Sequence, residues 1–84
     1  MGTRRNSMDI TVQILKIALN GAKKSHIVYR ANLNFEVVKK YLNHLKVSGL
    51  INSPSLGNRL FQTTLKGEEY IHRYDNLNNF IKVQ

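Results

Sequence analysis

The residues with the clearest chemistry in this chain are cationic and amide side chains gathered in one short segment. They are Lys39, Lys40, Asn43 and Lys46. Lysine ammonium groups hold phosphate oxygens, and lysine and asparagine also hydrogen-bond to the edges of guanine and adenine. The segment therefore predicts a surface for a polyanionic ligand, with Lys39 and Lys40 as its firmest contacts.

An amphipathic helix must carry these side chains. Val38, Leu42 and Leu45 recur at spacings of four and three, which places them on one apolar stripe and leaves the basic positions on other sides of the cylinder. Asn34 is expected to cap this helix. Ser48-Gly49 is expected to end it, because glycine accepts the left-handed conformation that follows many helix C-termini.

A small hairpin is predicted to follow this helix. Leu50-Ile51 opens one strand, and Arg59 to Thr63, rich in residues that favour β structure, forms the returning strand. Between them, Pro54 to Asn58 is dense in turn-forming residues. Thr64 is then expected to cap a further helix with its hydroxyl group.

Two more helices are predicted upstream. The first begins at Ser7 or Asp9 and ends at Asn20-Gly21, and the second is capped by Ser25 and runs from about His26 to Ala31. A short helix, a tight turn and a longer helix form a helix-turn-helix unit, whose second helix enters the major groove of DNA. The element order predicts a mainly α chain with a small β-hairpin (α+β), a winged helix-turn-helix with a long C-terminal helix.

Charge is distributed unevenly along the sequence. The net charge is +8, and residues 1–63 carry ten Lys or Arg against two acidic residues, whereas residues 64–84 carry three of each. A basic body joined to a neutral helix indicates that the body binds a polyanion. We expect residues 1–7 to form a flexible basic N-terminal arm, 8–66 a winged-helix DNA-binding domain, and 67–84 a C-terminal dimerisation helix.

Further DNA contacts are expected outside the basic helix. Residues around the second helix are placed to hold the phosphate backbone, Arg59 beside the turn could enter a minor groove, and Phe35 either touches thymine methyl groups or packs locally. The full predicted DNA-binding set is Asn34, Phe35, Lys39, Lys40, Asn43, Lys46, Lys23, Lys24, Ser25, Arg30 and Arg59.

The C-terminal helix carries a seam with the spacing of a coiled coil. Its first turns, with Leu65 and Ile71, are expected to cover the first helix of the same subunit. Beyond Tyr74 little of the domain remains for apolar side chains to pack against, so a second copy of the chain is their expected partner. The predicted dimer interface comprises Tyr70, Tyr74, Leu77, Phe80 and Ile81.

Taken together, these segments resemble the small archaeal winged-helix DNA-binding proteins, including chromatin-type members that dimerise through a C-terminal antiparallel coiled coil. The resemblance covers roughly residues 8 to 75. It rests most specifically on Ala31-Asn32-Leu33, Tyr41-Leu42 with Leu45, Gly49-Leu50-Ile51 and Thr64-x-Lys66-Gly67. It implies a winged-helix fold, dimerisation, and DNA binding by the third helix and the wing.

Several classes of function lack support in the sequence. Cysteine is absent, and His26, His44 and His72 are scattered without further ligands, so we expect no metal and no cofactor. No glycine-rich phosphate loop or nucleophile motif is present, which argues against an enzyme. No apolar run approaches the length of a membrane span and no signal peptide is evident, so we expect a cytoplasmic, nucleoid-associated protein.

The sequence thus predicts a homodimer that binds double-stranded DNA as a transcription regulator or a nucleoid-associated protein. A second interpretation is a winged helix that binds another protein and not DNA. RNA binding ranks third, because only Phe35 and Tyr29 are candidates for stacking on bases.

Overall fold

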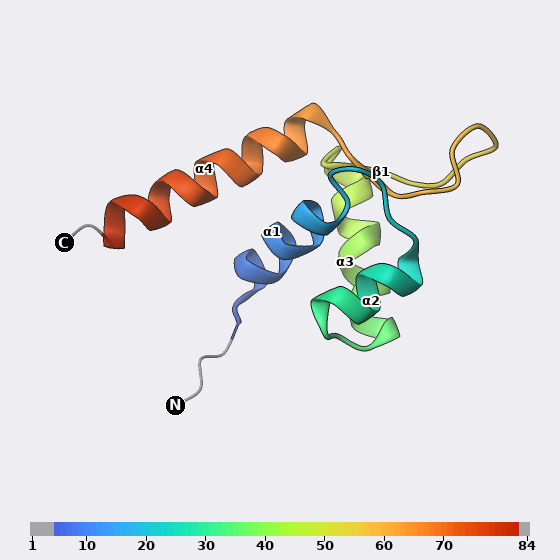
Figure 1. Ribbon diagram of the computed structural model, residues 1–84, viewed down its shortest axis with the longest axis horizontal. Helices are drawn as coiled ribbons and strands as arrows, with labels where there is room; N and C mark the ends of the chain where they lie inside the picture. Colours follow the sequence, from blue (N-terminus) through green and yellow to red (C-terminus); the bar gives the residue numbers. More distant parts are fainter. Residues whose placement is uncertain (1–4, 83–84) are drawn as a thin grey trace.

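The computed structural model describes the backbone of residues 5–82 and the side chains of residues 5–79. The elements are α1 (Ser7–Ile17), α2 (Lys24–Ala31), α3 (Phe35–Val47), β1 (Ile51–Asn52), β2 (Gln62–Thr63) and α4 (Leu65–Lys82). In Figure 1 the first three helices form a cluster, the loop between the strands projects at one end, and α4 leads away at the other. The predicted element order and fold class are confirmed.

The core lies where α1, α2 and α3 meet the hairpin and the first half of α4. Val38, Leu42 and Leu45 are buried, as their spacing predicted. Around them pack apolar side chains from every other helix and from β1. These include Ile14, Leu15, Ile27, Ile51 and Ile71.

The helix starts differ in part from prediction. The helix α1 begins at Ser7, one of the two predicted starts, and Asn6 caps it, exchanging hydrogen bonds with Asp9 in a capping box. Ser25 lies inside α2, whose first turn has no side-chain cap, so the predicted Ser25 cap is wrong. Asn34 caps α3 as expected, accepting from the backbone N–H of Val37 at 2.8 Å.

The turn between α2 and α3 also positions the chain's N-terminal segment. Asn32 adopts the left-handed conformation with φ of 56°, which asparagine tolerates better than most residues. The Arg5 guanidinium donates to the carbonyl of Ala31 at 2.6 Å and to that of Asn32 at 3.3 Å. Of the predicted arm, residues 1–4 lie outside the described residues, whereas Arg5 to Ser7 belong to the folded body.

The hairpin strands are shorter than predicted. Ile51 pairs with Thr63 and Asn52 with Gln62, and Phe61 forms an isolated antiparallel bridge with Ala22 ahead of α2. Proline has no N–H to donate to a strand ladder, so pairing ends before Pro54. Residues 53–61 therefore form a loop, which we call the wing.

The strand β2 and the start of α4 satisfy carbonyl groups at the ends of two helices. At the end of α1, the Thr63 hydroxyl donates to Leu15 at 2.6 Å, and the Gln62 amide donates to Leu19 at 2.6 Å. At the end of α3, the Thr64 hydroxyl donates to Gly49 at 2.8 Å. Leu15 lies in the last turn of α1, where carbonyl groups lack partners within the helix, and Leu19 and Gly49 lie just past the ends of α1 and α3. The hairpin and the helices therefore depend on one another.

The helix α4 approaches the hairpin most closely at Gly67. A Cβ atom at this position would lie 2.6 Å from the Thr63 methyl group and would also collide with the Leu50 carbonyl oxygen. Thr64 caps the helix as predicted, its hydroxyl accepting from the Gly67 N–H at 3.0 Å. Leu65, expected to cover α1, is exposed instead. Within the described residues, no helix has both the length and the apolar character needed to cross a membrane.

We predict that Gly67→Ala lowers the free energy of unfolding by about 3 kcal/mol, because the backbone of Leu50 must move to admit the methyl group. Urea unfolding followed by circular dichroism measures the change. Gly57→Ala in the wing is the matched control, since nothing lies within 4 Å of a Cβ placed there. Equal loss in both variants would contradict a packing role for Gly67.

Candidate nucleic-acid interface

The outer side of α3 presents three polar side chains in one stripe. Lys39, Asn43 and Lys46 are exposed and follow spacings of four and three, which aligns them on a helix. The buried stripe of Val38 and Leu42 is rotated by roughly a quarter of a turn from this polar stripe and packs into the core. The core therefore fixes the direction in which this basic stripe points.

Lys40 is exposed, as predicted, but it lies on a different side of α3 from Lys39. Adjacent residues are rotated by about 100° around an α-helix. That rotation places Lys40 beside His44, where both line a groove shared with the start of α1. The two lysines expected to act together thus border two different surfaces.

The first turn of α3 joins it to α2. The Lys24 ammonium lies 5.4 Å from the centre of the Phe35 ring, a distance suited to a cation–π contact. Phe35 remains 52% exposed. It thus packs locally against Lys24, and part of its ring is open to solvent. The Asn34 side-chain oxygen is engaged in the cap, which leaves its amide N–H groups as the donors for a ligand.

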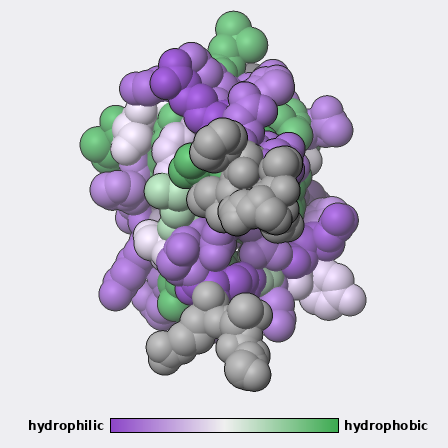
Figure 2. All heavy atoms as spheres, turned by 90° about the vertical axis from the view of Figure 1, so that its left-hand side faces the viewer, coloured by the Kyte–Doolittle hydropathy of each residue, from purple (hydrophilic) through white to green (hydrophobic). Residues whose placement is uncertain are grey.

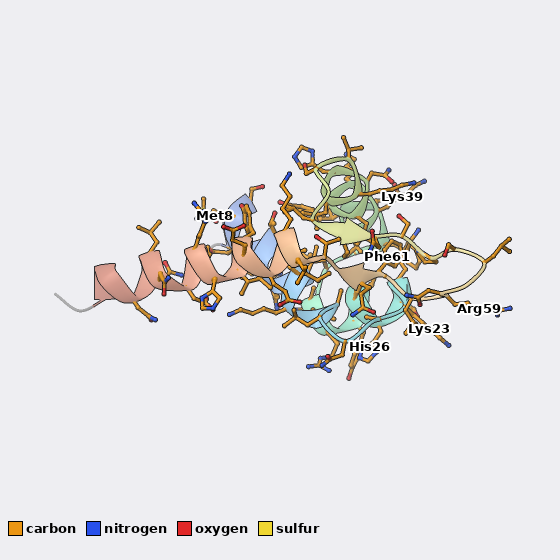
Figure 3. All side chains as sticks on the ribbon, turned by 90° about the horizontal axis from the view of Figure 1, so that it is seen from above. Met8, Lys23, His26, Lys39, Arg59 and Phe61 are labelled. Atoms are coloured by element: carbon orange, nitrogen blue, oxygen red, sulfur yellow. The ribbon has the colours of Figure 1, made fainter. Side chains whose placement is uncertain are left out.

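The residues around α2 that are predicted to hold the phosphate backbone of DNA are all accessible to solvent, to varying extents. Lys23, Ser25 and Arg30 are exposed, and Lys24 is half-buried. Figure 3 places Lys23, Lys39 and Arg59 at the end of the molecule opposite the C-terminal part of α4. The structure therefore brings residues of α2, α3 and the wing to one end of the body.

Hydrogen bonds within the wing hold its tip. Ser55 and Asn58 exchange backbone hydrogen bonds of 2.6 and 3.2 Å, and the Asn58 side chain accepts from the N–H of Leu60 at 3.0 Å. Arg59 follows this turn and is exposed. Leu56 at the tip is fully exposed, a feature that sequence reasoning missed. The sequence did indicate this feature, because an apolar residue stands among the turn-forming residues between the two strands.

The ion pairs of the described residues lie away from this end. Lys16 pairs with Asp75 at 3.2 Å, and Arg73 pairs with Glu69 at 2.8 Å, so every pair involves α4. Among the described residues, none of the basic side chains of α2, α3 and the wing has an acidic partner within 4 Å. This end of the molecule therefore carries uncompensated positive charge, which favours an anionic ligand.

The predicted dimer residues divide into two groups. Tyr70 and Tyr74 are half-buried against the core of their own chain. The Tyr74 hydroxyl donates to the Asp9 carboxylate, and this hydrogen bond raises the pKa of the Tyr74 phenol. Leu77 is 53% exposed. The side chains of Phe80 and Ile81 lie outside the described residues.

The histidines do not assemble a metal site. Within residues 5–82, no three histidine, aspartate or glutamate side chains come together as metal ligands require. His26 lies on α2, His44 on α3 and His72 on α4, and all three are exposed.

Comparison with known proteins agrees with this geometry. A family model described as winged helix-turn-helix matches residues 4–82. The structure is similar to that of Sso10a-2, a DNA-binding protein from Sulfolobus solfataricus, with a TM-score of 0.73 and 26% identity over 94% of this chain and 81% of that one. It also resembles a mutant of ZitR from Lactococcus lactis, with a TM-score of 0.60 and 19% identity over 99% of this chain and 66% of that one, a likeness that shows the fold alone. No curated protein sequence matches.

We predict that Asn34→Ala lowers the free energy of unfolding by about 1 kcal/mol, because the Val37 N–H loses its cap. Asn34→Asp should retain the parent stability, since a carboxylate accepts the same hydrogen bond and suits the positive end of α3. Thermal unfolding of the three proteins separates these outcomes. An alanine variant as stable as the parent would leave Asn34 free for ligand binding alone.

Proposed function

The chain belongs to the winged helix-turn-helix family, and on that premise we propose that it binds double-stranded DNA as a homodimeric transcription regulator or nucleoid-associated protein of the cytoplasm. The family match and the similarity to Sso10a-2 confirm the resemblance to small archaeal winged-helix DNA-binding proteins. One observation carries the proposal. At one end of the molecule, α2, α3 and the wing expose basic side chains that have no acidic partner among the described residues.

In the proposed complex α3 lies in the major groove and the wing lies on its flank. Lys39 and Lys46 are the central cationic contacts, because they share the outer stripe of α3. Asn43 stands between them and is placed to hydrogen-bond to a base edge. Arg59 reaches the neighbouring minor groove from the wing.

The exposed residues of α2 hold the phosphate backbone. Lys23, Ser25 and Arg30 are available for this role, and Lys24 adds its charge next to the Phe35 ring. Such contacts set the position of the protein on the duplex without selecting a sequence. Selection would then rest on α3, with Asn43 as the principal reader.

Dimerisation through α4 is the second part of the proposal. Tyr70 and Tyr74 pack against the core of their own chain, so the proposed dimer seam begins at Leu77. In the sequence, Phe80 and Ile81 continue it. Figure 2 looks onto this end of the molecule and shows separate hydrophobic patches on a mainly hydrophilic surface. The spacing of Leu77 and Ile81 in the sequence suits a helix-to-helix contact.

We predict a strongly ionic interaction with duplex DNA. If about six phosphates are neutralised per dimer, the logarithm of the affinity should fall against the logarithm of salt concentration with a slope of about −5. Fluorescence anisotropy of a labelled random duplex, titrated over a series of salt concentrations, gives the slope. Lys39→Ala combined with Lys46→Ala should weaken binding to all sequences by about tenfold and make the slope shallower.

The matched control is Arg73→Gln, which removes a positive charge from α4, on the far side from the proposed interface. It should leave the slope unchanged. Affinity that does not depend on salt would end the DNA proposal and favour the alternative, a winged helix that binds another protein.

We also predict that Leu77→Lys converts the protein from dimer to monomer, because burying an unpaired charge in the seam costs several kcal/mol. Sedimentation equilibrium measures the change. Leu65→Lys is the control, since Leu65 is 82% exposed on the same helix and its spacing of twelve residues rotates it about 120° from Leu77. A monomeric parent, or a dimeric Leu77 variant, would place the interface elsewhere or remove it.

A further inference from the structure

A groove of about 580 Å³ lies between the start of α1, the middle of α3 and the first turns of α4. Its floor is formed by Leu45, Leu50 and Thr11, which are almost fully buried. Met8 from α1 and Tyr70 from α4 line its sides. Met8 is 47% exposed, so its apolar side chain is available to a ligand.

The polar groups of this groove are positively charged or neutral. Lys40 and His44 stand one turn apart on α3 and form one lip. On the same helix, the Tyr41 hydroxyl donates to Ser7 of α1 at 3.3 Å. No carboxylate is among the residues that line the groove.

We infer that this groove binds a small amphipathic anion, a molecule with an apolar or aromatic body and a single carboxylate or sulfonate. The volume falls within the range of about 300 to 1,000 Å³ that ligand sites typically have. An apolar body fits against Met8 and Tyr70, over the floor at Leu45. The acidic group fits at the Lys40 ammonium, where a charge-assisted hydrogen bond forms.

Charge complementarity favours this ligand over a second copy of the chain. The basic body of a second copy, residues 1–63, would bring further positive charge to a lip that already holds Lys40 and His44. A small anion instead neutralises the lip. It also covers apolar side chains that the fold leaves open.

Occupation of the groove would be linked to the other face of α3. Lys40 lines the groove and, together with Asn43, also lines a second, shallower hollow on the outer side of α3. An anion held at Lys40 withdraws that charge from phosphate and places a negative group beside α3. Bound ligand therefore weakens DNA binding, and DNA weakens ligand binding by the same factor. This linkage rests on the proposed function, whereas the ligand site itself does not.

The ligand site is tested without DNA. Anilinonaphthalene sulfonate, an aromatic anion that fluoresces in apolar sites, should bind the full chain with saturation, and Lys40→Ala should raise its dissociation constant about tenfold. N-phenylnaphthylamine has the same ring system without the sulfonate, and its binding should not respond to Lys40→Ala. Lys39→Ala is the matched control, because it removes the same charge from the neighbouring position and should leave both probes unaffected.

Amide chemical shifts measured by NMR locate the sulfonate probe. Shifts at Thr11, His44 and Tyr70 are expected, and shifts confined to other elements would overturn the site. Equal weakening by Lys39→Ala and Lys40→Ala would also overturn it, since the probe would then report general positive charge. Probe binding that falls as the protein concentration rises would assign the groove to a second copy instead.

The linkage has its own measurement. Anisotropy titrations of duplex DNA with and without the sulfonate probe should show weaker DNA binding in its presence, and Lys40→Ala should abolish that difference. If the protein does not bind duplex DNA at all, the proposed function is wrong, but the measured binding of the probe to the groove still stands. Probe binding with no effect on DNA affinity would retain the site and reject its regulatory role.

Discussion

The structure depends on the way residues 62–67 satisfy the carbonyl ends of two helices at once. Thr63 and Gln62 donate to carbonyls at the end of α1, and Thr64 donates to Gly49 just past the end of α3. The hydrogen bond from Thr63 to the Leu15 carbonyl is buried, and a buried carbonyl without a donor costs free energy comparable to a lost hydrogen bond. The return strand therefore locks the angle between α1 and α3, and with it the direction of the basic stripe. Gly67 completes the arrangement by letting α4 begin directly against Leu50.

The division of charge follows from this architecture. Most acidic side chains of the described residues are engaged near α1 and α4, where Asp9 serves both a cap and Tyr74, and where Asp75 holds Lys16. The elements at the other end receive almost none of them, with Glu36 the exception. Exposed lysines near one another repel, which opposes folding slightly and favours an anionic partner. The ion pairs of the described residues and the expected binding surface thus lie at opposite ends of the body.

Local patterns were predicted well because they depend on few neighbours. The stripe of Val38, Leu42 and Leu45 and the caps at Asn34 and Thr64 are such cases. The predicted cap at Ser25 was wrong because α2 already begins at Lys24, before Ser25, and spacing alone does not resolve such a shift. Strand ends and the groove could not be predicted either, because they arise only when segments distant in sequence meet. The DNA-binding residues remain predictions, although the structure does separate Lys40 from Lys39.

The exposed leucine at the wing tip could add apolar contact to a complex that otherwise depends on charge. Leu56 is held fully exposed by the hydrogen-bonded turn between Ser55 and Asn58. Apolar contact releases no counterions, so any affinity that Leu56 adds to a complex would persist in concentrated salt after the lysine contacts have faded. It would also carry the heat-capacity signature of buried apolar surface, which ionic contacts lack. The same loop would then combine the charge of Arg59 with an apolar contact that does not respond to ionic strength.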